Sequence, residues 1–326
     1  MLEPLSVKQT VFVFGSINMD LVVKSPRLPV AGETLLGRDF FTAPGGKGAN
    51  QAVAIARLGI PTQIVGRVGG DSFGNELINS LQTAGVQTAH VLVDEAASSG
   101  VAAIAVDDAG ENQIIIIPGA NGRVNETDVE RLRSLLPGAI ALLLQFEIPI
   151  TAVLLAAKAA QQARVPVILD PAPAQLNVPS ELYRLVDIIT PNEIEAGQMV
   201  GFPVNDPESA TEAAAVLLQR GVKTAIVKLG AQGAVCVTKE ETFFVPAFPV
   251  LAVDTVAAGD AFNGGLAAAL AEGLTLRQAV VWGAAAGALA STKPGAQSSM
   301  CDRKTFNTFR EREGRFLNPK DTKDTL

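Results

Sequence analysis

The regular alternation of strand-like and helix-like segments from residue 124 onward constrains the fold of this chain more than any other feature. The alternating segments are a helix at 126–136, a strand at 139–147, a helix at 151–163, strands at 165–173 and 187–192, helices at 193–200 and 209–221, and a strand at 224–230. Segments of these lengths predict a mostly parallel sheet covered by helices on both faces. The hydrophobic content of 48% with only 5% aromatic residues agrees, because parallel strands read as short aliphatic runs. We therefore predict an α/β fold with a doubly wound central sheet.

The N-terminal half adds a strand at 10–14 and a helix at 51–58, but two of its segments lack the alternation. Residues 101–117 read as two strands joined by an Asp-Asp-Ala-Gly turn, and residues 21–46 are extended and rich in proline. We expect these two segments to form a small separate sheet. The alternative is that they are ordinary edge strands of the main sheet.

Polar residues follow the apolar core of several predicted strands. They are Asn18 and Asp20, Glu147, Asp170, Asn192 and Glu195, and the loop after Leu229. In parallel α/β sheets, ligands bind outside the carboxyl ends of the strands. These side chains therefore mark the predicted functional edge of the sheet.

Charge and residue counts exclude several classes of function. The formal net charge of -7 argues against nucleic acid as a partner. The single histidine, His90, makes Ser-His-Asp hydrolysis and His/Cys zinc chemistry improbable. Two cysteines provide no disulfide framework, and the most apolar stretch is interrupted by Gln145, Glu147 and Pro149. We expect a soluble cytoplasmic protein without a membrane partner.

The stretch DTVAAGDAFNGG at 254–265 places small residues before an acidic helix start. If a helix begins near Gly259, its first N–H groups are unpaired and accessible to a phosphate or a developing anion. Asp260 in the first turn can then accept a proton from a hydroxyl group. This combination predicts phosphoryl transfer to an alcohol. The plainer reading is that small residues pack closely on a sheet and Asp favours a helix start.

Three further segments are compatible with ligand binding but are weaker signals. The loop APGGKGANQA at 43–52 lacks the Walker A and G-x-G-x-x-G spacings, which disfavours P-loop NTPases and Rossmann dehydrogenases. Asn192 and Glu195 lie one helical turn apart and can hold water around Mg²⁺ or simply cap a helix. The loop KLGAQGAV at 228–235 fits a contact with ATP or is an ordinary turn.

Taken together, six segments resemble the ribokinase branch of the phosphofructokinase-B-type sugar kinase family. They are GSINMD at 15–20, GGKGANQA at 45–52, LDPAPA at 169–174, DIITPNEIEA at 187–196, KLGAQGA at 228–234 and DTVAAGDAFNGG at 254–265. The resemblance implies ATP-dependent phosphorylation of D-ribose at its 5-hydroxyl. It also implies a single kinase domain over residues 1–313, with lid segments at about 18–45 and 100–120 that pair two subunits, and a polar tail at 314–326.

The resemblance also implies roles for individual residues. Asp260 is the expected base, and the backbone of Ala257, Ala258 and Gly259 is the expected anion hole. The expected sugar site is Asn18, Met19, Asp20, Gly46, Lys47, Gly48, Ala49, Asn50, Glu147 and Asp260. The expected nucleotide site is Asn192, Lys228, Leu229, Gly230, Ala231, Gln232, Gly233, Gly259, Asp260 and Ala284. Glu195 is expected to organise Mg²⁺, and a K⁺ site is expected at Asp254, Val256, Ala290, Lys293, Gly295 and Ser299.

Two positions depart from the family pattern. Ala284 stands where some ribokinases carry a histidine near the adenine, and Lys228 replaces a threonine common at the start of the nucleotide loop. The alternatives are a kinase for another sugar or a nucleoside, or a sugar-binding regulatory protein without turnover.

Overall fold

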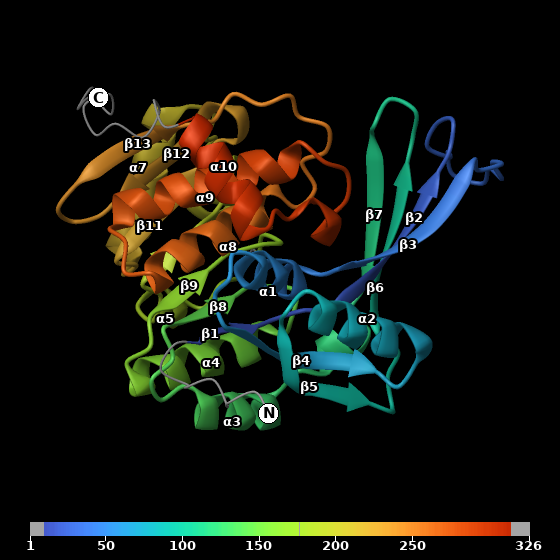
Figure 1. Ribbon diagram of the computed structural model, residues 1–326, viewed down its shortest axis with the longest axis horizontal. Helices are drawn as coiled ribbons and strands as arrows, with labels where there is room; N and C mark the ends of the chain where they lie inside the picture. Colours follow the sequence, from blue (N-terminus) through green and yellow to red (C-terminus); the bar gives the residue numbers. More distant parts are fainter. Residues whose placement is uncertain (1–9, 176, 314–326) are drawn as a thin grey trace.

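The central sheet confirms the predicted α/β architecture (Figure 1) in a computed structural model that describes residues 10–175 and 177–313. Its strands are β1 (Val11–Phe14), β4 (Thr62–Gly69), β5 (Gln87–Asp94), β8 (Ala141–Leu144), β9 (Val167–Leu169), β10 (Ile188–Ile189), β11 (Thr224–Lys228), β12 (Gly233–Val237) and β13 (Thr242–Pro246). Within the described residues the strand order is β13-β12-β11-β10-β9-β8-β1-β4-β5. Neighbours from β11 to β5 pair in parallel, and β12 and β13 extend the sheet as antiparallel strands. The predicted tail at 314–326 lies outside the described residues.

Helices cover both faces of this sheet and bury two apolar cores. One face carries α1 (Lys47–Arg57), α2 (Ser72–Thr83), α8 (Ala258–Ala271), α9 (Leu276–Ser291) and α10 (Arg303–Arg312). The other face carries α3 (Glu126–Leu135), α4 (Ile150–Ala163), α5 (Ser180–Tyr183), α6 (Glu193–Val200) and α7 (Pro207–Arg220). Strand β1 serves both cores, because Val11 and Val13 point to the first and Phe12 and Phe14 to the second. None of the helices in 10–175 and 177–313 has the length and apolar character to cross a membrane.

Local sequence signals explain where the helices begin and end. The side chain of Asp206 accepts a hydrogen bond from the Ser209 amide at the start of α7, and Pro207 occupies the first turn. Helix α6 begins with a capping box and ends at Gly201 in the left-handed region. Short 3₁₀ turns, η2 (Gly119–Arg123), η3 (Gly230–Gln232) and η4 (Gln297–Ser299), complete the described structure.

The segments without helical period form a second sheet, which we call the lid sheet. Its strands are β2 (Asn18–Lys24), β3 (Asp39–Gly45), β6 (Gly100–Val106) and β7 (Asn112–Ile117), in the order β3-β2-β6-β7. The expectation of a small separate sheet is confirmed, and these strands are not edge strands of the main sheet. The lid sheet projects from the helical body, with the start of β2 near the end of β1 (Figure 1).

Candidate active site

The polar residues that follow the parallel strands meet at one edge of the main sheet. Gln145 and Glu147 follow β8, Asp170 follows β9, Asn192 follows β10, and Lys228 ends β11. Parallel strands place their carboxyl ends at a common edge, so residues distant in sequence become neighbours. Hydrogen bonds join this edge to helices α1 and α8, which lie on the same face.

Asp260 is the buried carboxylate at the centre of this group. Its side chain accepts hydrogen bonds of 3.0 Å from Asn50 Nδ2 and from Gln51 Nε2. The residue is 5% exposed, and loss of hydration raises the pKa of its carboxyl to about 6, against the opposing effect of the Lys47 ammonium. A carboxylate with this pKa is ionised at neutral pH but remains basic enough to accept a proton.

The N-terminus of α8 presents bare backbone beside Asp260. The N-cap residue is Ala257, which has no side-chain group to cap the helix, and the amides of Gly259 and Asp260 lie in the first turn. Helix amides at this position are unpaired and carry partial positive charge. The helix begins at Ala258, one residue before the predicted start, and an anion can approach it closely.

Glu147 organises the end of β1 and the start of α1. Its Oε2 accepts hydrogen bonds from Ser16 Oγ at 2.6 Å, from the Lys47 amide at 3.0 Å and from Asn18 Nδ2 at 3.4 Å. The Asn18 side chain is also held by Asn121, whose Nδ2 donates to Asn18 Oδ1 at 2.7 Å. The Glu147 carboxylate and the side-chain amides of Asn18 and Asn121 are polar groups suited to a polyhydroxylated ligand.

Asp20 contributes a second titratable group to the same region. Burial raises the pKa of its carboxyl to about 7, and the nearby carboxylates Glu147 and Asp260 add to the increase. Burial opposes the charged form of Lys47, but the carboxylates around it, led by Asp260 and Asp170, outweigh this effect and raise the pKa of its ammonium. Several carboxyl groups of the site therefore surround the Lys47 ammonium.

Two glycines allow α1 to begin against the end of β1. Gly46 has φ 88°, and a Cβ there would lie 2.7 Å from the Asn18 amide nitrogen. A Cβ on Gly48 would lie 2.7 Å from the Ser16 amide nitrogen. The helix begins at Lys47 rather than at residue 51 as predicted, because the glycine-rich run obscured its first turn.

Asn192 and Glu195 form the capping box of α6, which is the plainer of their two predicted roles. The Asn192 side chain accepts from the Glu195 amide at 2.8 Å, and Glu195 Oε2 accepts from the Asn192 amide at 2.8 Å. Glu195 is 8% exposed, and burial together with the nearby Asp170 raises the pKa of its carboxyl. Among the residues that the structure describes, none donates a hydrogen bond to the other oxygen, Glu195 Oε1.

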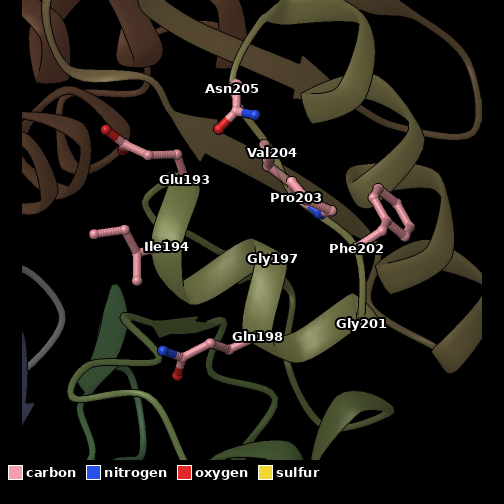
Figure 2. Close-up of a pocket in the computed structure, with 9 residues that line it drawn as sticks. All are labelled: Glu193, Ile194, Gly197, Gln198, Gly201, Phe202, Pro203, Val204 and Asn205. Atoms are coloured by element: carbon pink, nitrogen blue, oxygen red, sulfur yellow. The ribbon is translucent and has the colours of Figure 1, made fainter.

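The loop from Lys228 to Gly233 connects β11 to β12 through η3. Its Gln232 side chain donates to the backbone oxygen of Asn205 at 2.8 Å. Asn205 also lines a pocket of about 360 Å³ beside α6, which Figure 2 shows with Glu193 and Phe202. This pocket adjoins the loop but contains none of the carboxylates described above.

The residues expected at a K⁺ site lie in the loop before α8 and in the segment from the end of α9 to η4. Asp254 joins these two segments, because its Oδ2 accepts a hydrogen bond of 2.8 Å from the Gly295 amide. Its Oδ1 accepts from the Val256 amide at 3.0 Å within the loop before α8. The Lys293 amide donates to the Ala290 oxygen at 3.2 Å, and Ser299 is buried in η4. Within 10–175 and 177–313, no group of three or more His, Cys, Asp or Glu side chains is arranged to hold a metal.

Several expected site residues pack into the core instead of presenting side chains to the site. Met19 and Ala49 are fully buried in one core and Leu229 is buried in the other. Ala284 is partly buried on α9 against the first core. These four residues can contribute backbone groups or shape, but no polar side chain.

Four polar residues at the site were not predicted to belong to it. They are Ser16, Gln51, Asn121 and Gln145. Gln51 directly follows Asn50 in the glycine-rich segment, which is a signal the sequence offered. Asn121 lies in η2 after the lid sheet and carries no local signal.

Comparisons with known proteins agree on one family. The model of the pfkB family carbohydrate kinase matches residues 8–303. Ribokinase from Haemophilus influenzae is 41% identical over 305 residues, which cover 94% of this chain and 99% of that protein. The crystal structure of ribokinase from Thermotoga maritima has a TM-score of 0.84 at 38% identity, covering 93% of this chain and 99% of that one. The structure of Arabidopsis thaliana ribokinase complexed with ribose and ATP has a TM-score of 0.85 at 35% identity, covering 92% and 98%.

Proposed function

This chain belongs to the pfkB family of carbohydrate kinases, and from that premise we propose that it transfers the γ-phosphoryl group of ATP to the 5-hydroxyl of D-ribose. The observation that carries the proposal is the placement of Asp260, a buried carboxylate in the first turn of a helix whose N-terminal amides are bare. A base and an anion-binding backbone are thereby adjacent. This is the arrangement that phosphoryl transfer to an alcohol requires.

The sugar is bound between the lid sheet and the start of α1. Asn18 and Asp20 at the base of β2 hold its secondary hydroxyls, together with Asn50 and Glu147. The bare backbone at Gly46 and Gly48 lets the ring approach α1 closely. The 5-hydroxyl then points toward Asp260.

The chemical step is a direct displacement at phosphorus. The 5-hydroxyl oxygen bonds to the γ-phosphorus while its proton passes to the Asp260 carboxylate. The bond from the γ-phosphorus to the bridging oxygen breaks, and ADP leaves with that electron pair. The amides of Gly259 and Asp260 at the α8 N-terminus stabilise the charge on the phosphoryl oxygens.

The nucleotide lies along the loop Lys228–Gly233, with Asn192 at the phosphates and Ala284 near the adenine ring. The partly engaged carboxylate of Glu195 fits the water shell of Mg²⁺, which neutralises phosphate charge when bound. The carbonyl-rich loops that Asp254 joins fit K⁺, in agreement with the preference of hard cations for oxygen ligands.

We place the enzyme in the cytoplasm, because ATP is available there and both cysteines are free.

A coupled ADP-release assay tests the proposed function. We expect turnover with Mg-ATP to be strongest on D-ribose among D-ribose, 2-deoxyribose, fructose and adenosine, and to increase when potassium is added. Preference for another acceptor would retain the kinase but change its substrate. Ribose binding by calorimetry without turnover on any acceptor would support a regulatory protein.

We further propose that the lid sheet pairs two copies of this chain. Its edge strand β7 exposes consecutive isoleucines, with Ile114 51% and Ile115 67% exposed, and Phe40 on the opposite edge strand β3 is 61% exposed. Unpaired apolar edge strands favour association, and a second lid sheet offers a matching apolar surface.

Replacing Ile115 by Lys is expected to convert a dimer into a monomer in light scattering coupled to size-exclusion chromatography. An ammonium group at the centre of this surface cannot be buried without a partner. The matched control is Ile194→Lys on α6, where the isoleucine is 65% exposed but lies outside the lid sheet. A wild-type monomer, or a dimer that survives Ile115→Lys, would contradict pairing through the lid.

A further inference from the structure

The ammonium group of Lys228 lies against the backbone that begins α8. A Cβ placed on Gly259 would be 3.3 Å from Lys228 Nζ. Lys228 ends β11, and its side chain is 13% exposed, so the ammonium faces the interior of the site. The cation therefore lies beside the amides that receive the phosphoryl group in the proposed function.

Asp170 holds this ammonium at a fixed place. Asp170 Oδ1 lies 3.0 Å from Lys228 Nζ, and the Asp170 side chain is 3% exposed. The other oxygen, Oδ2, accepts a hydrogen bond of 3.0 Å from Gln51 Nε2. Both oxygens of this carboxylate are thus engaged by partners from different elements.

Gln51 connects Asp170 to the base. Its Nε2 donates to Asp170 Oδ2 and to Asp260 Oδ1, each at 3.0 Å, and its Oε1 accepts from Gln145 Nε2 at 2.7 Å. Gln51 and Gln145 are both fully buried. Because each polar atom of the Gln51 amide is used, the amide cannot rotate without breaking a buried hydrogen bond. This series of hydrogen bonds through Asp170 and Gln51 fixes the separation between the Lys228 ammonium and the Asp260 carboxylate.

The distribution of charge in the site indicates a role for the Lys228 ammonium. The carboxylates of the site are Asp20, Glu147, Asp170, Glu195 and Asp260, and its ammonium groups are Lys47 and Lys228. A phosphoryl group in transit spreads negative charge over its oxygens and requires fixed positive charge at that point. Lys47 lies among the carboxylates, whereas Lys228 adjoins the bare helix end.

We propose that Lys228 is a catalytic residue that stabilises the phosphoryl group during transfer, and that Asp170 and Gln51 position its ammonium relative to Asp260. This inference rests on the proposed phosphoryl transfer. Lys228 donates hydrogen bonds to the phosphoryl oxygens and neither gives up nor accepts a proton. The proton of the sugar hydroxyl still passes to Asp260, and ADP remains the leaving group.

The test compares ground-state and transition-state binding in Lys228→Met. Calorimetry with ribose present measures the affinity for Mg-ADP alone and for Mg-ADP with aluminium fluoride, an anion that mimics the phosphoryl group in transit. We expect Lys228→Met to lower kcat by about 100-fold and to weaken binding of the aluminium fluoride complex by a similar factor. Mg-ADP affinity should change by less than about threefold, because the ammonium acts at the γ position.

Lys223→Met is the matched control, because Lys223 also pairs with an aspartate, Asp187, at 2.6 Å but is 72% exposed. It should leave all these values unchanged. Lys228→Arg should recover part of the lost kcat, and Asp170→Asn should weaken the aluminium fluoride complex while Mg-ADP binding persists. These three results together would support the inference.

Unchanged kcat in Lys228→Met, or equal weakening of Mg-ADP with and without aluminium fluoride, would overturn the inference. Failure of the proposed function is distinct, because it would appear first as absence of turnover in the unmodified chain.

Discussion

Replacing Asp260 by Asn is expected to lower kcat with ribose by about 10³-fold, while ribose still binds. The amide cannot accept the hydroxyl proton, and its NH₂ group must face one of the two donors, Asn50 Nδ2 or Gln51 Nε2. A turn of the Asn50 amide lets its Oδ1, which has no hydrogen-bond partner among the described residues, accept from that NH₂ group, so the shape of the site is retained. Steady-state assays give kcat, and calorimetry gives the ribose affinity.

The control for Asp260→Asn is Asp206→Asn. Asp206 is also an acidic residue at a helix start, and it caps the exposed N-terminus of α7. Asparagine caps helices about as well as aspartate, so this variant should keep full activity. Near-normal turnover in Asp260→Asn would mean that another group accepts the proton.

The pH dependence of kcat provides a second test of Asp260 as the base. Burial raises the pKa of the Asp260 carboxyl to about 6, so the carboxylate is protonated and inactive as a base below that pH. We expect kcat to fall as the pH decreases through about 6 and to be level above it. Asp20, with a pKa of about 7, titrates nearby and affects the sugar site, so kcat is measured at saturating ribose. The residual activity of Asp260→Asn should lack the step at about pH 6.

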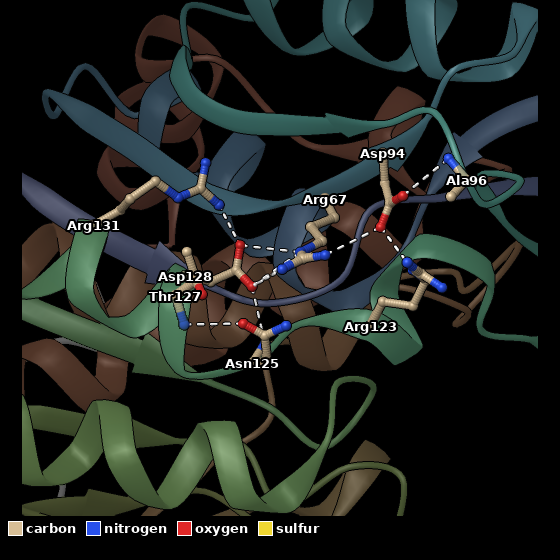
Figure 3. Close-up of polar contacts among 8 residues, drawn as sticks. All are labelled: Arg67, Asp94, Ala96, Arg123, Asn125, Thr127, Asp128 and Arg131. Carbon is tan, nitrogen blue, oxygen red and sulfur yellow. Dashed lines mark hydrogen bonds and ion pairs between the residues drawn. The ribbon is translucent and has the colours of Figure 1, made fainter.

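Replacing Arg67 by Met is expected to destabilise the fold by about 3 kcal/mol. Figure 3 shows the Arg67 guanidinium between the carboxylates of Asp94 and Asp128. Its Nη2 lies 2.7 Å from Asp128 Oδ2, and its Nη1 lies 3.0 Å from Asp94 Oδ2. Asp128 is fully buried, and removal of the cation from β4 takes away the buried ion-pair partner of its carboxylate. Arg131 also pairs with Asp128, which limits the loss. Urea denaturation monitored by circular dichroism measures the free energy of unfolding.

The matched variant for this measurement is Arg133→Met. Arg133 pairs with Glu130 on the surface of α3, at 3.3 Å with both side chains about half exposed. Exposed pairs contribute less than about 1 kcal/mol, so this variant should unfold close to the unmodified chain. Equal stability of Arg67→Met and Arg133→Met would show that the buried cluster is not a structural requirement.

The ion pairs of Arg67 with Asp94 and Asp128 also extend toward the candidate active site. Asp94 accepts from Arg123 Nε at 2.7 Å, and Arg123 lies in η2. The same turn carries Asn121, which holds Asn18 at the base of the lid sheet. No motif in the sequence indicated this arrangement, because its charged residues come from four separate segments.

The sequence predicted the fold well where local patterns carry the information. Alternating apolar runs and helical periods require a parallel sheet between helices, and the absence of helical period at 21–46 and 101–117 indicated a second sheet. Asn192, which the sequence offered as a possible cap, stands at the start of α6. The start of α7 was predicted at residue 209, two residues late, because the cap at Asp206 and the proline after it were not used. The start of α1 was misjudged, since glycines next to Lys47 carry no helical signal.

The chain by itself determined the α/β class and the small second sheet and led to the prediction of Asp260 as the base, because these depend on period, residue type and neighbours along the sequence. Tertiary structure alone decided which side chains meet. Gln51 lies between Asp260 and Asp170, and Lys228 lies beside Gly259, because parallel strands and two helices bring distant segments to one edge. Sequence periodicity specifies which face of an element is buried. It does not specify which polar groups from other elements will satisfy one another there.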